Sequence, residues 1–188
     1  MSIRLPAKLR ILPSPEAVVK AREISTPANV IATMATHHDR LYRHWMSLHA
    51  TILLGFDTPR RERELIILRM GWLCQSEYEF GQHTLYGLEE AGLTDEEIYH
   101  LTRPLQTYPW VDNERSLLQL TDELYANDRV TDETWDELER RWSAKEILEF
   151  VVCATAYRMV SGLLNTLKVE LDEGVPSWPT PPSACPDI

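Results

Sequence analysis

Residues 59–73 are apolar around most of a helical circumference. A helix at the surface of a protein needs only a stripe of apolar residues, so a helix that is apolar on nearly every side lies in the middle of a bundle. The segment therefore predicts a central helix that other helices surround. This constraint governs what the rest of the chain can form. The large apolar residues of the segment 59–73 are Leu65, Ile66, Ile67, Leu68 and Trp72.

Helical spacing of apolar residues continues along most of the chain. Spacings of three, four and seven over residues 28–55 predict one amphipathic helix or two in series. Thr58 is expected to cap the central helix, and a capping box from Thr94 to Glu97 is expected to start a short one. No alternating strand pattern is present, so the predicted fold class is all-α, a helical bundle. Further helices are expected over residues 75–91, 94–101, 113–125, 131–141 and 144–171.

The chain has 188 residues, which is enough for a single domain with a sizeable core. Prolines divide it into three parts. Residues 1–27 are expected to form an N-terminal arm with a short helix over residues 15–24, and residues 28–174 the helical core. Residues 175–188 are a proline-rich tail that is expected to be extended or disordered.

The chain carries 19 basic and 29 acidic residues, and its formal net charge is −10. An acidic surface repels phosphate backbones and anionic lipids, so neither nucleic acid nor a membrane is an expected partner. The N-terminus lacks a continuous apolar stretch, and the longest nearly apolar run, residues 147–157, is too short to span a bilayer. The three cysteines form no CxxC pair, which fits a reducing compartment. We therefore expect a cytoplasmic protein without a signal peptide or structural disulfides.

Three polar residues share one face of the helix expected over residues 75–91. At about 100° per residue, Ser76, Glu79 and His83 fall within a sector of about 60°. Glu79 and His83 are four residues apart, so the carboxylate can contact the imidazole, set its tautomer and raise its basicity. Such a pair suits a base or a proton shuttle. A solvated helix face has the same pattern, so that interpretation remains open.

Other residues near the junction of these two helices favour a site. Tyr78 and Trp72 bring large amphipathic rings to it. Glu64 lies among the apolar residues of the central helix, where a carboxylate needs a partner or a raised pKa. Glu64 could instead lie on a narrow wet face beside Arg61.

Metal and cofactor sites have little support in the sequence. His37, His38 and Asp39 are adjacent, and adjacent helical residues point about 100° apart, so they do not share a face. HExxH, CxxC, GxGxxG and P-loop motifs are absent, so we expect neither a metal ion nor a cofactor.

Cys74 is either a nucleophile or a small buried hydrophobe. Surface or partner-satisfied positions are expected for His44, His49 and His100, and core-anchoring positions for Trp45, Trp72, Trp135 and Trp142.

The stretch from Arg61 to Ile98 contains the strings RERELIILR, CQSEYEFGQH and AGLTDEEI. It resembles the carboxymuconolactone decarboxylase family, which includes the alkylhydroperoxidase D-like (AhpD-like) proteins. The resemblance extends over most of residues 35–176. It implies an all-α bundle that assembles into a homo-oligomer, as a dimer, trimer or hexamer, with sites near the subunit contacts.

In the peroxidase branch of that family, a glutamate precedes a CxxC pair and a histidine. Glu64 and His83 match the glutamate and the histidine, but Ser76 and Glu79 stand at the two cysteine positions. Without a dithiol there is no thiolate to attack a peroxide and no resolving partner. The decarboxylase branch has the form Tyr-Glu-x-x-x-His, which Tyr78, Glu79 and His83 supply.

The resemblance therefore implies a cofactor-independent decarboxylase that acts on a small carboxylated or lactone-like substrate. His83 would deliver a proton, with Glu79 orienting it and Glu64 acting as a second acid or base. Tyr78 would donate to the developing oxyanion. Arg69 would either clamp the carboxylate or form a surface or structural ion pair. Isomerisation, cyclisation or dehydration could use the same groups. The other expected substrate-binding residues are Trp72, Cys74 and Ser76.

Two alternatives remain. The first is a thiol-dependent peroxidase or reductase that uses Cys74. The second is a non-catalytic helical assembly module that has kept the fold and lost the chemistry. A cavity that encloses His83 would favour an enzyme, whereas a fully exposed or tightly packed His83 would favour the module.

Overall fold

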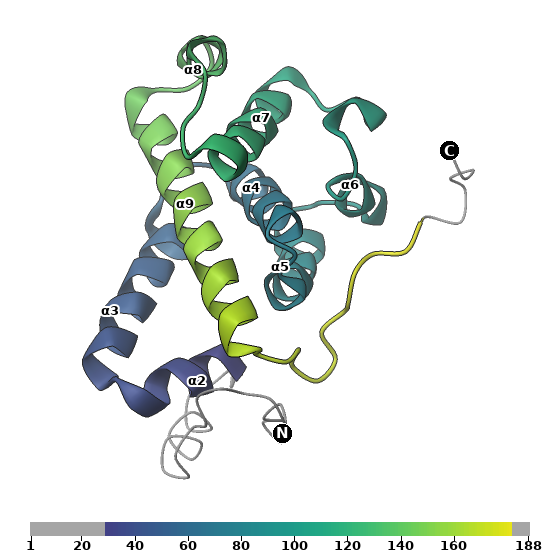
Figure 1. Ribbon diagram of the computed structural model, residues 1–188. Coiled ribbons are helices and arrows are strands. Elements are labelled where there is room, and N and C mark those ends of the chain that lie inside the picture. Colours follow the sequence, from purple (N-terminus) through teal and green to yellow (C-terminus); the bar gives the residue numbers. More distant parts are fainter. Residues whose placement is uncertain (1–28, 182–188) are drawn as a thin grey trace.

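The computed structural model describes residues 29–181, and every element in that range is helical (Figure 1). The predicted all-α fold class is thus confirmed, while the oligomeric state remains a prediction. Residues 29–55 form two α-helices in series followed by a short π-helical turn, one of the two arrangements expected from the sequence. The elements are α2 (Asn29–His37), α3 (Asp39–Ala50), η1 (Thr51–Gly55), α4 (Arg60–Leu73), α5 (Glu77–Glu90), α6 (Asp95–His100), η2 (Leu105–Thr107), α7 (Asp112–Asn127), α8 (Asp132–Glu139) and α9 (Ala144–Leu167).

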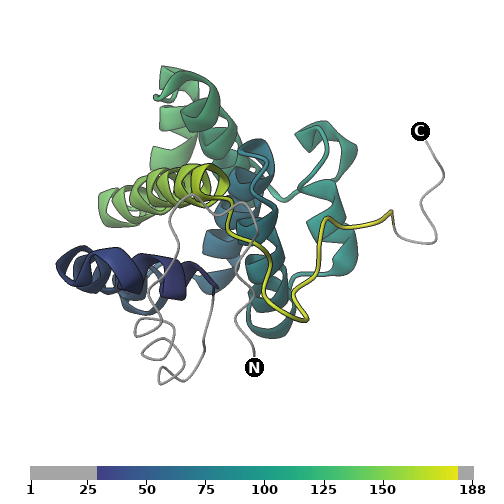
Figure 2. The same ribbon diagram turned by 60° about the horizontal axis from the view of Figure 1, so that its bottom comes forward.

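Helix α4 is the centre of the bundle. Residues 63–71 are all buried, as the apolar circumference of this segment predicts. Helices α5, α7 and α9 pack around it. Helices α2 and α3 lie on the side of α9 away from α7 and α8 (Figures 1 and 2).

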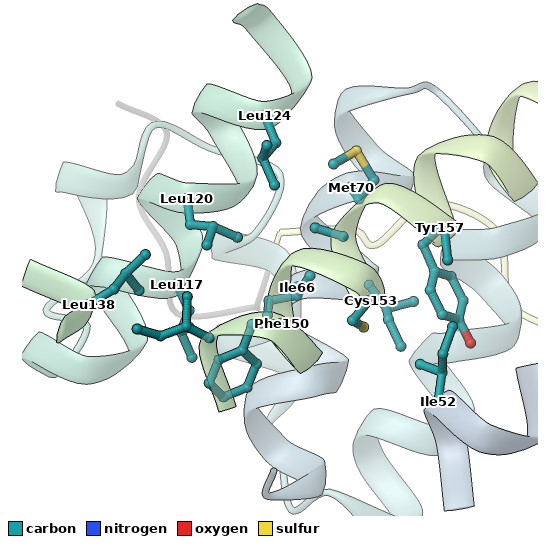
Figure 3. Packing of buried hydrophobic residues seen from close by; sticks show 14 residues of the cluster. Ile52, Ile66, Met70, Leu117, Leu120, Leu124, Leu138, Phe150, Cys153 and Tyr157 are labelled. Carbon is teal, nitrogen blue, oxygen red and sulfur yellow. The ribbon is translucent and has the colours of Figure 1, made fainter. Parts of the chain in front are cut away.

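Two hydrophobic clusters occupy different faces of α4. One joins α4 to α7, α8 and α9, and Figure 3 shows its side chains interdigitating between these helices. The other joins α4 to α5, α6 and the loop before α7. Because α4 contributes to both clusters, its position is determined from nearly all directions. The α4 residues are Ile66, Ile67 and Met70 in the first cluster and Leu65 and Leu68 in the second.

Helix α9 is long and apolar enough to cross a bilayer by length and composition. More than half of its most apolar stretch, however, is buried inside the protein. Phe150, Cys153 and Tyr157 belong to the first cluster, against α4 and α7 (Figure 3). Within the described residues, α9 therefore has the packing of a buried core helix.

The helix boundaries depart from the sequence expectations at two places. Thr58 does not cap α4: Pro59 holds that position, and the Thr58 backbone N–H donates instead to a Glu149 carboxylate oxygen at 2.9 Å. Helix α9 ends at Leu167 rather than at residue 171, because Lys168 adopts a left-handed conformation with φ of 57°. The predicted capping box at Thr94 is present.

The C-terminal segment, defined here as residues 168–181, returns along α5 (Figure 1). Asp172 accepts hydrogen bonds from the Tyr78 hydroxyl at 2.6 Å and from the Asn29 backbone N–H at 2.8 Å. Trp178 packs its ring against Trp72 and Phe80. The described part of the predicted tail is thus extended and packed. Some expectations lie outside the described residues. They concern the arm over residues 1–27, its helix over residues 15–24, and residues 182–188 of the tail.

Gly81 is where α5 and the C-terminal segment approach most closely. A Cβ added to Gly81 would collide with the Pro176 backbone carbonyl and lie 2.9 Å from Val175. We expect Gly81→Ala to displace the segment and lower the free energy of unfolding by about 1–3 kcal/mol. Gly162 in α9 is the matched control, since nothing lies within 4 Å of its added Cβ. Gly162→Ala should be neutral or raise stability by about 0.5–1 kcal/mol. Denaturant unfolding of both variants checks this, and equal effects would contradict the close approach.

Candidate active site

The turn between α4 and α5 brings two distant acid–base groups together. Gln75 adopts a left-handed conformation with φ of 52°, and the Ser76 backbone N–H donates to the Gly71 carbonyl at 2.8 Å. The chain reverses within three residues, so α5 runs back along α4. Glu64 in α4 and His83 in α5 then face each other.

The imidazole of His83 is held between two carboxylates. Its Nδ1 lies 2.6 Å from a Glu64 carboxylate oxygen, and its Nε2 lies 3.1 Å from a Glu79 carboxylate oxygen. The exposed fractions are 4% for His83, 1% for Glu64 and 5% for Glu79. The i,i+4 contact expected from the sequence is therefore present, and it is buried. The two alternatives, a solvated helix face and a wet position for Glu64, do not hold.

The protonation of His83 follows from its partners. A carboxylate only accepts hydrogen bonds, so a ring that bonds one carboxylate through each nitrogen donates from both and is an imidazolium. Burial by itself lowers the pKa of His83, but the charge of Glu64 and the hydrogen bonds to Glu64 and Glu79 outweigh burial and raise it to about 10. We call this imidazolium, held between the two carboxylates, the His83 clamp.

One side of the clamp borders a cavity of about 210 Å³ between α2, α3, α5 and α9. Glu79 and His83 form part of its wall. Much of the remaining wall is apolar or aromatic. None of the residues found to line it is a lysine or an arginine, so the described wall offers no fixed cation besides the imidazolium. The other lining residues are Val30, Ile31, Trp45, Met46, His49, Leu53, Tyr78, Gln82, Tyr86, Tyr157 and Val160.

Tyr78 lines the cavity, but its hydroxyl proton is already used in a hydrogen bond within the protein. Its hydroxyl donates to Asp172 at 2.6 Å and accepts from the Val30 backbone N–H at 3.3 Å. Burial and the charge of Asp172 raise the pKa of Tyr78. In this arrangement Tyr78 ties α5 to the C-terminal segment and to α2. To serve as an oxyanion donor it would first have to release Asp172.

Arg69 lies away from the cavity wall. Its guanidinium is bidentate to Asp122 at 2.6 and 2.9 Å, and it donates to the backbone carbonyls of Leu101 and Arg103. These hydrogen bonds occupy the guanidinium N–H donors that would have to bind a substrate carboxylate. The structure thus gives Arg69 a role in joining α4 to α7 and to the end of α6, and it does not bring the residue to the cavity.

The remaining sequence candidates are also outside the cavity lining. Cys74 ends α4, its thiol contacts the Met70 sulfur at 3.7 Å, and burial raises the pKa of Cys74. Ser76 is fully buried at the start of α5. Trp72 packs against Trp178. A raised thiol pKa opposes thiolate formation.

Two cavity residues on α3 were not anticipated from the sequence as site residues. Trp45 was expected only to anchor the core, and His49 to be a surface or satisfied histidine. Both line the cavity, and their ring centroids are 4.2 Å apart. The only local signal was their i,i+4 spacing on an amphipathic helix. Which face of α5 they would meet depends on how α3 packs.

Three wider depressions among the described residues lack comparable chemistry. One of them, of about 570 Å³, lies along α7 and α8 and is lined by polar residues. Glu123 in its wall accepts hydrogen bonds from Thr131, Thr134 and Gln119, so these groups satisfy each other. Within residues 29–181, no three His, Cys, Asp or Glu side chains are arranged to hold a metal ion.

Comparisons with known proteins agree on the fold. Residues 39–123 match the model of the carboxymuconolactone decarboxylase family. A peroxidase-related protein from Silicibacter sp. TM1040 is 12% identical with a TM-score of 0.75, covering 93% of this chain and 96% of its own. The debrominase Bmp8, in complex with 2,3,4-tribromopyrrole, is 16% identical with a TM-score of 0.70, covering 87% and 92%. A protein of unknown function from Agrobacterium tumefaciens is 17% identical with a TM-score of 0.69, covering 73% and 94%. No curated protein matches the sequence.

The raised pKa of His83 predicts a pH-dependent stability. The folded value is about 10 against an ordinary 6.5, so the stabilisation is complete below pH 6.5 and is lost as the pH rises to about 10. His83→Gln leaves two buried carboxylates without their cation and should cost about 3–5 kcal/mol at pH 7. The difference from wild type should shrink between pH 7 and 10.

Chemical denaturation at a series of pH values measures this difference. His44→Gln is the control, because His44 is an exposed histidine on α3. Its stability should follow the wild-type pH dependence. Wild type and His83→Gln curves that run parallel from pH 7 to 10 would show that His83 is not the imidazolium of the clamp.

Proposed function

We propose that this chain, which belongs to the carboxymuconolactone decarboxylase and AhpD-like superfamily, is an enzyme that moves protons on a small oxygenated molecule without a cofactor. The observation that carries the proposal is the His83 clamp in the wall of a cavity of about 210 Å³. A buried imidazole with a strongly shifted pKa beside a cavity is typical of an acid–base site.

The clamp supplies protons through Glu79. His83 donates to Glu79 on the cavity side and to Glu64 on the core side. As a substrate carbon gains negative charge, a proton passes from His83 through the Glu79 carboxylate to that carbon. Glu64 keeps the ring oriented and stabilises its charge before the transfer. No other group is needed to store this proton.

The cavity favours a neutral substrate over a carboxylate. The clamp has a net charge of −1, and no lysine or arginine is found in the described wall to offset it. A carboxylate brought beside Glu79 would be repelled in a low-dielectric site. Proton shifts such as enol–keto isomerisation therefore fit better than decarboxylation, which would need a cationic clamp for the departing group. The similar debrominase binds 2,3,4-tribromopyrrole, which is also a small uncharged ring.

The thiol alternative has less support. Cys74 is outside the cavity lining, and its pKa is raised rather than lowered. Within the described residues, no second cysteine lies beside it as a resolving partner. The assembly-module alternative is disfavoured by the cavity beside His83, because a module has no use for a buried charged triad that borders a cavity.

A proton-exchange screen tests the proposed function. Small cyclic enols, ketones, lactones and their carboxylated analogues are incubated with the protein in D₂O. NMR then detects enzyme-dependent deuterium incorporation at carbon, and mass spectrometry detects a product lighter by one CO₂. We expect exchange on neutral compounds. Loss of CO₂ from an acid would instead support the decarboxylase.

For any compound that exchanges, His83→Gln and Glu79→Gln should each slow the reaction by about 10²–10⁴-fold. Two variants should react like wild type: His44→Gln, which changes an exposed histidine, and Cys74→Ser, which removes the thiol. Circular dichroism confirms that each variant is folded. Full activity in both His83→Gln and Glu79→Gln would refute the proton role, and loss of activity in Cys74→Ser would favour thiol chemistry.

A further inference from the structure

A second histidine of the cavity, His49 on α3, is not used by the clamp. Its exposed fraction is 8%. Its Nδ1 lies 2.8 Å from the Trp45 backbone carbonyl, which only accepts hydrogen bonds, so Nδ1 carries the proton of the neutral ring. The lone pair is therefore on Nε2. Within residues 29–181 this buried nitrogen has no hydrogen-bond partner.

Trp45 presents the complementary group one helical turn away. Its Nε1–H is a donor only, and it too is buried without a partner among the described residues. The two rings are in contact, with centroids 4.2 Å apart, and both line the cavity. A buried polar group without a partner destabilises the fold, because it has given up its hydrogen bonds to water and gained none in return. Because both residues line one cavity, a single ligand atom that reached both nitrogens would pair the acceptor and the donor.

A hydroxyl oxygen has the required chemistry, because it can donate to Nε2 and accept from Nε1–H at the same time. The size of the ligand follows from the cavity of about 210 Å³. An apolar cavity of about 150 Å³ is large enough to hold benzene. The ligand is therefore a compound of about one ring. The net negative clamp beside it selects a neutral one.

Resting on the proposed function, we propose that His49 is the catalytic base of this site, and that its substrate is a neutral, ring-sized enol held at its hydroxyl by His49 and Trp45. His49 Nε2 takes the hydroxyl proton, and the O–H electrons form the C=O bond. The C=C electrons take a proton from the Glu79–His83 pair to make a new C–H bond. One proton then returns from His49 to that pair through solvent, which resets both groups.

The groups facing His49 allow it to remain neutral. Burial lowers the pKa of His49. The hydrogen bond to the Trp45 carbonyl and the charge of Glu79 oppose this effect without cancelling it, and the charge of His83, the smallest of the four effects, lowers the pKa slightly further. Tyr78 and Tyr86 of α5 and Tyr157 of α9 also line the cavity, whereas α2 and η1 contribute only apolar side chains. A neutral imidazole and an imidazolium thus lie in one cavity and can act as base and acid at the same pH.

Binding of three matched probes tests the inference without turnover. Phenol has the ring and the hydroxyl, anisole lacks the donor, and benzoate is an anion of the same ring size. Calorimetry should show phenol binding at least 10-fold more tightly than anisole and benzoate. In protein labelled with ¹⁵N-histidine, phenol should shift the His49 Nε2 resonance and leave that of His44 unchanged.

Two variants separate hydrogen bonding from base catalysis. His49→Phe keeps a ring but has no acceptor, so phenol and anisole should bind equally. His49→Gln restores an acceptor that cannot take up a proton, so the preference for phenol should return while proton exchange stays at least 100-fold below wild type. Equal binding of phenol and anisole to the wild-type protein, or an unchanged preference in His49→Phe, would overturn the inference.

The outcomes distinguish this inference from the proposed function. If no compound exchanges in wild type but the phenol preference depends on His49, the ligand site stands, and the proposed function and the role of His49 as base both fail. If exchange depends on His83 and not on His49, the proposed function stands and the base is another group. Trp45→Phe, which removes only the N–H donor, should weaken the binding of both phenol and anisole, because each has an oxygen that accepts from Nε1–H, and should leave the preference for phenol in place.

Discussion

The site depends on one buried imidazolium held between two carboxylates. Removing two carboxylates from water is costly, and they are tolerated only because His83 neutralises part of their charge and fills their hydrogen bonds. The clamp joins α4 to α5 across their shared face. Since α4 is itself enclosed by α7 and α9, the position of Glu64 is determined by the whole bundle. The core therefore orients the charged groups at the edge of the cavity.

The pKa values of two histidines in the same cavity are shifted in opposite directions by their surroundings. His83 meets carboxylates at both nitrogens, and they raise its pKa against the effect of burial. His49 meets no carboxylate at hydrogen-bond distance within the described residues, and burial lowers its pKa. Environments that push the pKa values of neighbouring groups apart produce an acid and a base at one pH. Identical side chains acquire different chemistry through their surroundings, and the cavity between them is suited to transfer of protons in both directions.

The structure shows where the two residues lie that replace the cysteines of the dithiol peroxidases. At the two positions where those relatives carry cysteines, this chain has Ser76, which is buried outside the cavity lining, and Glu79, which lies in the cavity wall. A carboxylate in place of a thiol can exchange protons but cannot form a disulfide. The histidine and the first glutamate are matched by His83 and Glu64, which form the His83 clamp together with Glu79. Arg69, an attractive carboxylate ligand in sequence, is fully used in joining helices.

Local sequence determined the elements and one half of the site. The apolar circumference of α4, the capping box at Thr94 and the i,i+4 contact of Glu79 with His83 all follow from helical periodicity, which acts over a few residues. Tertiary structure alone decided the rest. Glu64 meets His83 because a three-residue turn reverses the chain, and His49 reaches the same cavity because α3 packs near α5 and α9. Such contacts depend on how whole helices pack, and no short-range pattern encodes the direction in which one helix faces another.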